Sequence, residues 1–181
     1  MDLSEKQLSS EYFYRGKIIN MRRDNALLPD GSEAFREVVE HPGGVGVCPL
    51  TDEGEVLLVR QFRYPYFEEI LEIPAGKLDP DETPVNCGIR ELLEETGARA
   101  ENVFPLGKIY PTPGYTTEII HVFGATGLSF ENARPDEGEF LEPVKIPLEK
   151  AYKMVMSGEI TDAKTQIAVL KIWNMKQNNE I

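Results

Sequence analysis

The sequence predicts an α+β sandwich, and three observations support this fold class. Short strand-like segments follow one another from the N-terminal region onward, a single amphipathic helix interrupts them, and two further helical patterns stand near the C-terminus. Strands and helices do not alternate regularly, so a doubly wound parallel sheet is a poorer fit. The chain has 181 residues, which is enough for one domain with a full hydrophobic core, or for one domain with a small extension.

The N-terminal region, residues 12–41, is predicted to be rich in β-structure. Extended segments at 17–28 and 33–39 flank the sequence Pro-Asp-Gly-Ser at 29–32, which is a strong turn signal. Three glycines, Gly43, Gly44 and Gly46, then mark the entry into a strand at 45–50. A turn at 52–54 leads into an apolar strand at 55–60, and residues 69–73 form a further short strand candidate.

A helix is predicted between Thr83 and Gly97. Thr83 is a favourable N-cap, Pro84 suits the first helical position, and Gly97 is placed to end the helix. Apolar residues and one threonine recur at helical spacing and predict a buried stripe: Val85, Ile89, Leu92 and Thr96. Gly88 inside the helix indicates close packing of its backbone against a neighbour.

The C-terminal half continues with two strands and two helices. The strands are predicted at 103–110 and 118–125, and the helices at 148–156 and 162–175. The apolar face of the last helix is predicted to consist of Ala163, Ile167, Leu170 and Trp173.

Composition excludes several classes of protein. Hydrophobic residues make up 41% and charged residues 28% of the chain, as in ordinary globular proteins. The formal net charge of −12 repels nucleic-acid backbones and anionic membranes. No apolar signal core or membrane-length apolar run is present, which predicts a cytoplasmic location. The cysteines, Cys48 and Cys87, are interpreted as small buried hydrophobic residues, and the histidines, His41 and His121, as structural residues.

The candidate chemistry concentrates on the predicted central helix. Glu91 and Glu95 are four residues apart and share a helix face, and Glu94 lies beside them. Because the predicted buried stripe lies on another face, these carboxylates are expected to point outward, into a cleft or into solvent. Spacing alone favours a solvated acidic face whose repulsion Arg90 partly offsets. The alternative is a site for divalent cations, and an all-oxygen donor set would favour Mg²⁺ or Mn²⁺ over zinc.

The complete pattern around these glutamates reverses that preference because it resembles the signature of the Nudix hydrolases. The matching positions follow one another without a gap: Gly76, Glu82, Arg90, Glu91, Leu92, Glu94, Glu95, Gly97 and Ala98. The resemblance implies the Nudix fold, a mixed β-sheet sandwiched between α-helices and preceded here by a small N-terminal β-rich unit. It also implies hydrolysis of a nucleoside diphosphate linked to another moiety, with metal ions held on this loop and helix.

Segments outside this pattern resemble the ADP-ribose pyrophosphatase branch of the family. They lie at 36–45, 58–63, 72–79 and 111–114, and Glu118 follows them. The similarity extends over residues 12–173. It implies hydrolysis of ADP-ribose to AMP and ribose 5-phosphate, dependence on Mg²⁺ with Mn²⁺ as an alternative, and a homodimer. The implied organisation is an N-terminal dimerisation unit at 1–42 and a Nudix hydrolase domain at 43–181.

The resemblance also implies roles for individual residues. The metal ligands would be Glu91, Glu95, the carbonyl of Ala75 and Glu139, with Glu94 a weaker candidate. Arg90 and Glu82 would organise the loop and helix. Glu137 would act as the general base, although Glu137 and Glu139 could exchange roles.

On the substrate side, arginines suit a diphosphate or ribose because of their forked guanidinium group. The implied binding residues are Arg36, Arg63, Phe35, Thr112, Gly114 and Glu118. Phe35, Tyr12, Phe13 and Tyr14 are candidates for stacking on adenine, and they could equally form the core of a dimer. Lys17 and Ile18 stand where an aromatic residue would be expected, which leaves room for other nucleotide sugars.

Two alternatives remain open at this point. The chain could act on another nucleoside diphosphate sugar or on a dinucleotide, or it could be a non-catalytic Nudix module that senses nucleotides or binds RNA. The intact set Glu91, Glu94 and Glu95 argues against a silent module, since such a module has no need for that repulsion. The net charge of −12 argues against RNA.

Overall fold

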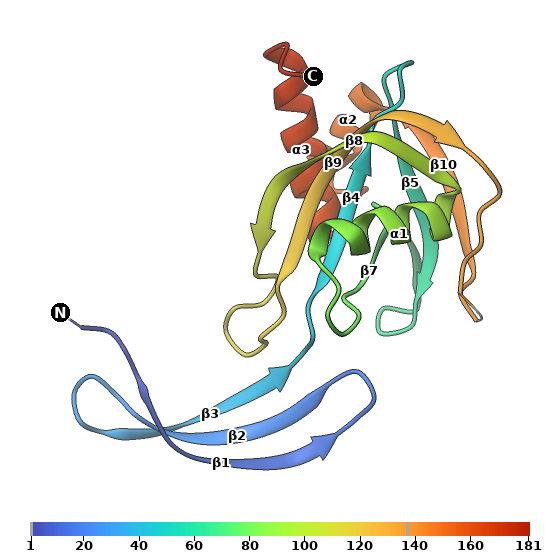
Figure 1. The fold of residues 1–181 in the computed structure, drawn as a ribbon. Coiled ribbons are helices and arrows are strands. Elements are labelled where there is room, and N and C mark those ends of the chain that lie inside the picture. Colours follow the sequence, from blue (N-terminus) through green and yellow to red (C-terminus); the bar gives the residue numbers. More distant parts are fainter. Residues whose placement is uncertain (1, 137) are drawn as a thin grey trace. The chain divides into compact units, whose positions relative to one another are not determined.

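The computed structural model describes residues 2–136 and 138–181 and divides the chain into two compact units (Figure 1). The first unit is formed by Met1–Gly43 and Tyr110–Ile119, and the second by Gly44–Ile109 and Ile120–Ile181. Within the described residues, no helix is both long and apolar enough to cross a membrane. The cytoplasmic location stays a prediction from the sequence.

The first unit is built on a three-stranded antiparallel sheet. Its strands are β1 (Lys6–Arg15), β2 (Asn20–Leu27) and β3 (Glu33–Glu40), in the order β1-β2-β3. The predicted turn joins β2 to β3, and it is closed by a hydrogen bond of 2.8 Å from the Leu28 amide to the Ser32 carbonyl. Strand β1 was not predicted, because every one of its side chains is exposed and the sequence therefore lacks the alternation that marks a half-buried strand.

The second unit contains two sheets. The mixed sheet has the order β7-β4-β9-β8, with β4 parallel to β9 and the other pairs antiparallel. The antiparallel sheet has the order β10-β5-β6. The strand bounds are β4 (Gly44–Pro49), β5 (Glu55–Arg63), β6 (Glu68–Glu72), β7 (Ala75–Lys77), β8 (Ala98–Ile109), β9 (Ile120–Phe130) and β10 (Leu141–Pro147).

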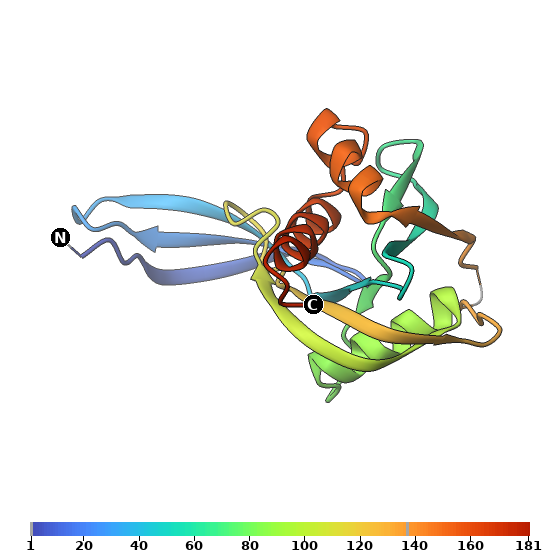
Figure 2. The same cartoon turned by 90° about the horizontal axis from the view of Figure 1, so that it is seen from above.

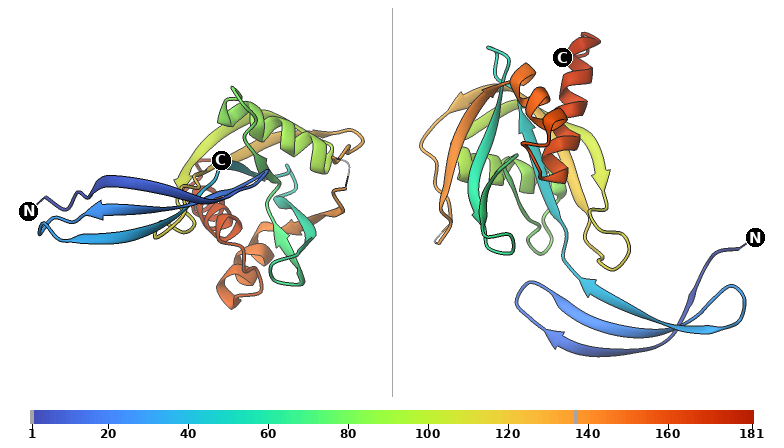
Figure 3. Two further views of the ribbon diagram at one scale, coloured as in Figure 1. Left: turned by 90° about the horizontal axis from the view of Figure 1, so that it is seen from below. Right: turned by 180° about the vertical axis from the view of Figure 1, so that it is seen from behind.

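Helices cover both faces of the mixed sheet. Figures 2 and 3 show α1 (Pro84–Thr96) on one face and α3 (Ala163–Gln177) on the other, while α2 (Leu148–Ser157) packs against α3 and against β5 and β10 of the antiparallel sheet. The alternation along β4 produces this arrangement: Val45 and Val47 belong to the core cluster on the α1 side, whereas Cys48 belongs to the cluster that includes residues of α2 and α3. The predicted α+β sandwich with a mixed sheet is therefore confirmed.

Two short strands were missed, and each has a local reason. Strand β7 has only three residues, and its sequence Ala-Gly-Lys carries no strand signal. Strand β10 contains Pro143 and Pro147, which disfavour a strand in sequence. Prolines are tolerated in edge strands, and β10 lies at the edge of its sheet.

The predicted buried face of α3 was wrong. The side chains that α3 buries are Lys164, Thr165, Ala168, Val169 and Ile172, while Leu170 is exposed. The apolar pattern misled because the buried stripe begins with a lysine and a threonine, whose polar groups find partners elsewhere in the fold.

Candidate active site

Helix α1 is held by caps at both ends and by close packing in its middle. The Thr83 side chain accepts a hydrogen bond from the Asn86 amide, and Gly97 adopts φ = 71°, with its amide bound to the Leu93 carbonyl. A Cβ at Gly88 would lie 2.9 Å from Val47 Cγ2, so this glycine lets the helix approach β4 closely, as its position predicted. These contacts determine which face of α1 points inward.

That inward face carries Glu91 and Glu95, which corrects the expectation that these two carboxylates lie on a different face from the buried residues and point into a cleft or solvent. Glu95 is only 3% exposed, whereas Val85 and Ile89 of the predicted buried stripe are 37% and 45% exposed. Glu91 is also largely covered, with its side chain 13% exposed. Close packing at Gly88 turns the buried face away from Val85 and Ile89 and toward Cys87, Glu91 and Glu95.

The backbone of β7 contacts both buried carboxylates. The Ala75 amide donates a hydrogen bond of 3.0 Å to Glu95 Oε2. A Cβ on Gly76 would stand 1.8 Å from Glu91 Oε1, so only glycine leaves room for that carboxylate. A single strand segment, Ala75–Gly76, thereby lies against Glu91 and Glu95 together.

Burial makes these two carboxylates hard to ionise in the absence of a cation. It is the largest cause that raises the pKa of Glu95, to about 8, and the negative charges of Glu91 and Glu139 add to it. Burial likewise raises the pKa of Glu91 above its ordinary value, against the opposing effect of Arg90. A positive ion beside Glu91 and Glu95 would stabilise their ionised forms and offset this cost of burial.

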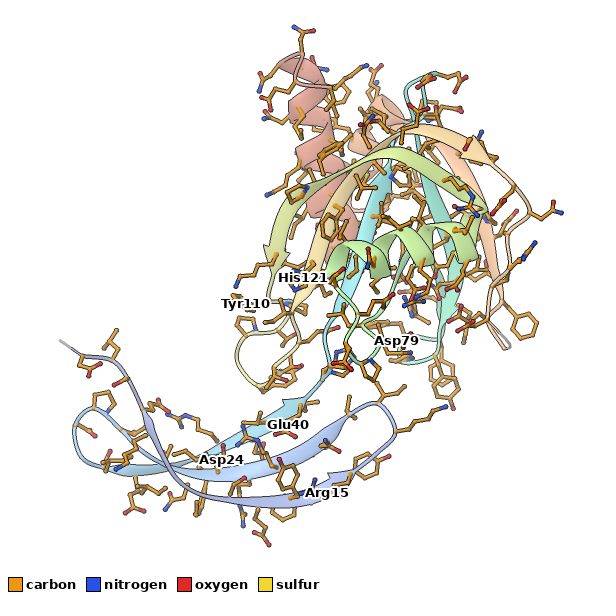
Figure 4. All side chains as sticks on the ribbon, in the orientation of Figure 1. Arg15, Asp24, Glu40, Asp79, Tyr110 and His121 are labelled. Carbon is orange, nitrogen blue, oxygen red and sulfur yellow. The ribbon has the colours of Figure 1, made fainter. Side chains whose placement is uncertain are left out.

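Arg90 forms hydrogen bonds to three glutamates in α1 and in the loop before it. It grips Glu82 through two hydrogen bonds of 3.0 and 2.9 Å, and its Nη1 lies 2.8 Å from Glu91 and 2.9 Å from Glu94. The hydrogen bonds from Arg90 lower the pKa of Glu82 to about 2. Glu82 therefore stays ionised and holds the loop between β7 and α1, in which Figure 4 labels Asp79.

The segment that carries the remaining acidic candidates is tied to the end of α1. The Glu131 amide donates to the Gly97 carbonyl and the Arg134 amide to the Glu94 carbonyl, both at 2.8 Å. Glu139 is exposed, and its charge raises the pKa of both Glu91 and Glu95. Glu137, the predicted general base, lies outside the described residues.

The donor set fits a hard divalent cation, although the residues do not yet surround one point. Among residues 2–136 and 138–181, no three or more His, Cys, Asp or Glu side chains converge closely enough to hold a metal ion. Arg90 hydrogen-bonds Glu91, and the Ala75 amide hydrogen-bonds Glu95. The donors are all oxygens, and the absence of a side chain at Gly76 lets the Glu91 carboxylate lie against the β7 backbone.

Arg63, the substrate-binding candidate of the second unit, is anchored by a buried partner. Glu72 is 1% exposed and accepts hydrogen bonds from Arg63 Nε and Nη2, the latter at 2.7 Å. Lys164 forms a second ion pair with the same carboxylate. Neither Glu72 nor Lys164 was singled out from the sequence, because the two residues lie far apart along the chain and neither stands in the glutamate pattern of α1.

The first unit contains a pocket of its own, with a volume of about 720 Å³. Phe35, Arg36 and Gly114 line it, whereas Thr112 and Glu118 are not among its lining residues. Glu118 instead approaches His41 Nδ1 to 3.6 Å. The structure thus brings together three of the five substrate-binding candidates of this unit.

Two features of the pocket bear on what it can bind. Arg36 is already paired with Glu5 by hydrogen bonds of 2.8 and 2.7 Å, so an anionic ligand would compete with Glu5. Asp24 Oδ1 is buried and has no hydrogen-bond partner among the described residues. Figure 4 labels Asp24 and Glu40 on the sheet of the first unit. The pocket therefore offers the aromatic ring of Phe35 and a guanidinium that Glu5 already occupies.

Both cysteines are buried, as predicted. Burial raises the pKa of the Cys48 and Cys87 thiols to about 12, so neither is a thiolate at neutral pH.

Known proteins resemble the chain over nearly its whole length. Residues 40–165 match the NUDIX domain, and residues 5–39 match the nucleoside diphosphate sugar hydrolase N-terminal domain. An ADP-ribose pyrophosphatase of Bacillus subtilis (strain 168) is 44% identical over 169 residues, covering 92% of this chain and 91% of that protein. A methanol dehydrogenase activator of Bacillus methanolicus is 40% identical, covering 91% and 90%. A crystal structure of an ADP compounds hydrolase superposes with a TM-score of 0.87 over 100% of both chains, at 22% identity, and shows the same fold.

These matches and the fold define the chain as a pyrophosphohydrolase with an additional N-terminal β unit. The chain belongs to the Nudix family. Pyrophosphatases of this family generally use divalent metal ions.

Proposed function

We propose that the chain hydrolyses the diphosphate linkage of ADP-ribose and releases AMP and ribose 5-phosphate. The observation that carries the proposal is the contact of the Ala75–Gly76 backbone with the buried carboxylates of Glu91 and Glu95. The similarity to the Bacillus subtilis ADP-ribose pyrophosphatase supports the choice of substrate.

Mg²⁺ is the proposed metal, with Mn²⁺ as an alternative. Glu91, Glu95, the Ala75 carbonyl and Glu139 would hold it, and these hard oxygen donors are the type that both ions prefer. When bound, such an ion neutralises diphosphate charge and lowers the pKa of coordinated water. Arg90 would maintain the positions of Glu91 and Glu94 through its hydrogen bonds.

The nucleoside is proposed to occupy the pocket of the first unit. The Phe35 ring would stack on the base. Arg36 and, in the second unit, Arg63 would bind the diphosphate or the terminal ribose. Thr112 and Glu118 are retained as weaker candidates because they lie outside the pocket lining.

We propose a homodimer because the sheet of the first unit leaves apolar side chains exposed. All of β1 is exposed, including Tyr12, Phe13 and Tyr14, and such an apolar surface is typical of an interface. Neither of the two buried core clusters found among the described residues includes residues of this sheet. A second copy of the chain would cover it.

A substrate panel tests the proposed function directly. Purified chain is incubated with Mg²⁺ and, separately, with ADP-ribose, ADP-glucose, GDP-mannose, NADH or a diadenosine polyphosphate, and phosphate-terminated products are quantified. We expect ADP-ribose to give the highest kcat/KM, with AMP and ribose 5-phosphate in equal amounts. A chelator should abolish turnover, and added Mg²⁺ should restore it.

The other outcomes of the panel are equally informative. A higher kcat/KM for a guanosine sugar, or for a dinucleotide, would move the assignment to another substrate of the same family. No turnover of any compound, with Mg²⁺ or Mn²⁺ present, would favour a non-catalytic nucleotide sensor.

Separate glutamine variants of Glu137 and Glu139 identify the general base. The base must accept a proton from the attacking water, so its amide variant should lose about 10²–10⁴-fold in kcat with metal affinity unchanged. We expect this behaviour for Glu137→Gln. For Glu139→Gln we expect weaker Mg²⁺ activation, measured as a higher Mg²⁺ concentration at half-maximal rate. If both variants keep full turnover, the assignment of this segment is wrong.

A further inference from the structure

The second unit contains a buried ion cluster that the residue assignments above do not use fully. Its centre is Glu72, the last residue of β6, which lies just before the Ala75–Gly76 segment. Two cations share its carboxylate: Arg63 approaches from β5 and Lys164 from the start of α3. Burial by itself would raise the pKa of Glu72, but Arg63 and Lys164 together hold the pKa below its ordinary value.

Lys164 is fixed in place by its own neighbours. It is buried, and its Nζ lies 3.0 Å from Asp162 Oδ1. Asp162 also caps α3 by accepting from the Thr165 amide at 2.9 Å. The Thr165 hydroxyl in turn accepts a hydrogen bond of 2.8 Å from the Ile73 amide. The start of α3 is thus attached to the residue that follows Glu72.

Burying the Lys164 ammonium group costs desolvation free energy, so we ask what the charge contributes. The Arg63–Glu72 pair is complete without it, because the carboxylate already receives two hydrogen bonds from the guanidinium. An apolar side chain of similar volume would avoid the desolvation of a buried ammonium group. The retained charge therefore indicates an electrostatic role toward a neighbouring group.

Arg63 is the group whose properties Lys164 changes. The Arg63 side chain is 39% exposed, and among the described residues its Nη1 makes no hydrogen bond. Without Lys164, Glu72 would neutralise Arg63 alone, and the nearby charges of Asp162 and Glu95 would act on Arg63 as well. With Lys164 sharing Glu72, the open edge of the guanidinium keeps positive potential for an anion.

We propose that Lys164 is a positioning residue of the reaction: by sharing Glu72 it keeps Arg63 oriented and electropositive for the diphosphate of the substrate. This inference rests on the proposed function, in which Arg63 binds substrate. Lys164 itself does not touch the substrate.

The test compares Lys164→Met, Lys164→Arg and a matched control, Lys171→Met, by steady-state kinetics and thermal unfolding. Lys171 lies on the same helix, and its Nζ bonds the Leu106 carbonyl at 2.5 Å, so its replacement reports loss of a helix anchor. We expect Lys164→Met to raise KM by about tenfold and to change kcat by less than about threefold. Lys164→Arg should restore KM to within about threefold of the original, and Lys171→Met should leave KM unchanged.

The substrate for these assays is whichever compound of the panel the unmodified chain turns over fastest, so an error in the proposed substrate does not count against Lys164. An unchanged KM in folded Lys164→Met would overturn the inference. A loss of kcat and of thermal stability that arginine does not rescue would also overturn it, because it would mean a purely structural role. If Lys164→Met does not fold, Lys164→Gln replaces it, with the same expected rise in KM and the same overturning results.

Discussion

Replacing Glu95 by glutamine is expected to lower kcat by about 10³-fold or more, because the amide cannot hold a divalent cation as a carboxylate does. The fold should survive the change. Glutamine has the same shape, and its oxygen can still accept the hydrogen bond from the Ala75 amide. Steady-state rates with ADP-ribose and Mg²⁺ measure the loss.

Thermal unfolding separates this effect from instability. Burial raises the pKa of Glu95 to about 8, so near neutral pH the fold disfavours the ionised side chain when no cation is present. In a chelator, the midpoint of Glu95→Gln should therefore equal or exceed that of the unmodified chain. Glu149→Gln, on the exposed face of α2, is the matched control and should keep both activity and midpoint. Full turnover in Glu95→Gln would remove Glu95 from the site.

The second large effect is expected from Gly76→Ala. The new Cβ would stand 1.8 Å from Glu91 Oε1, so the Glu91 carboxylate must move. Because a displacement of about 1 Å in a catalytic group can cost about 10²-fold in rate, we expect a loss of that size in kcat/KM. The midpoint of thermal unfolding should fall as well, since the clash strains the contact between β7 and α1.

A double variant shows whether the clash with Glu91 causes the lower unfolding midpoint of Gly76→Ala. Glu91→Ala in the Gly76→Ala background should recover the unfolding midpoint without recovering activity. Gly158→Ala is the control for loss of a glycine: it lies at the end of α2 with φ = 80° and open space around it, so it should cost about 1 kcal/mol of stability and leave activity intact. If Gly76→Ala keeps full activity, the Glu91 carboxylate does not need its position against β7.

Helix caps, turn residues and apolar runs in the sequence predicted the elements whose formation depends on neighbouring residues. Thr83, Pro84 and Gly97 predicted both ends of α1 because a helix must satisfy its terminal amides and carbonyls with nearby groups. The turn at 29–32 was predicted by its Pro-Asp-Gly-Ser sequence, and the strands β4 and β5 were predicted by short apolar runs next to glycines or turns. Strand β1 was not, since a fully exposed strand has no alternation to detect.

The candidate site was predicted in part. The spacing of Glu91, Glu94 and Glu95 identified the helix that carries it, and Gly76 was marked by its place in the family pattern. The assignment of these glutamates to an outward face was wrong for Glu91 and Glu95, because apolar periodicity alone does not register a carboxylate that is buried against backbone amides and a glycine. Glu72 and Lys164 were missed because their pairing joins β6 to α3.

The Nudix family and the mixed-sheet sandwich could be inferred from the amino-acid sequence, since the motif spacing and the helix caps depend only on residues near one another in the chain. The inward face of α1 and the charges that share a buried partner became evident in the folded chain. The physical reason is that burial of a charge depends on groups brought into contact from distant segments: the Gly88 approach to β4 turns Glu95 inward, and the packing of α3 beside β6 brings Lys164 to Glu72.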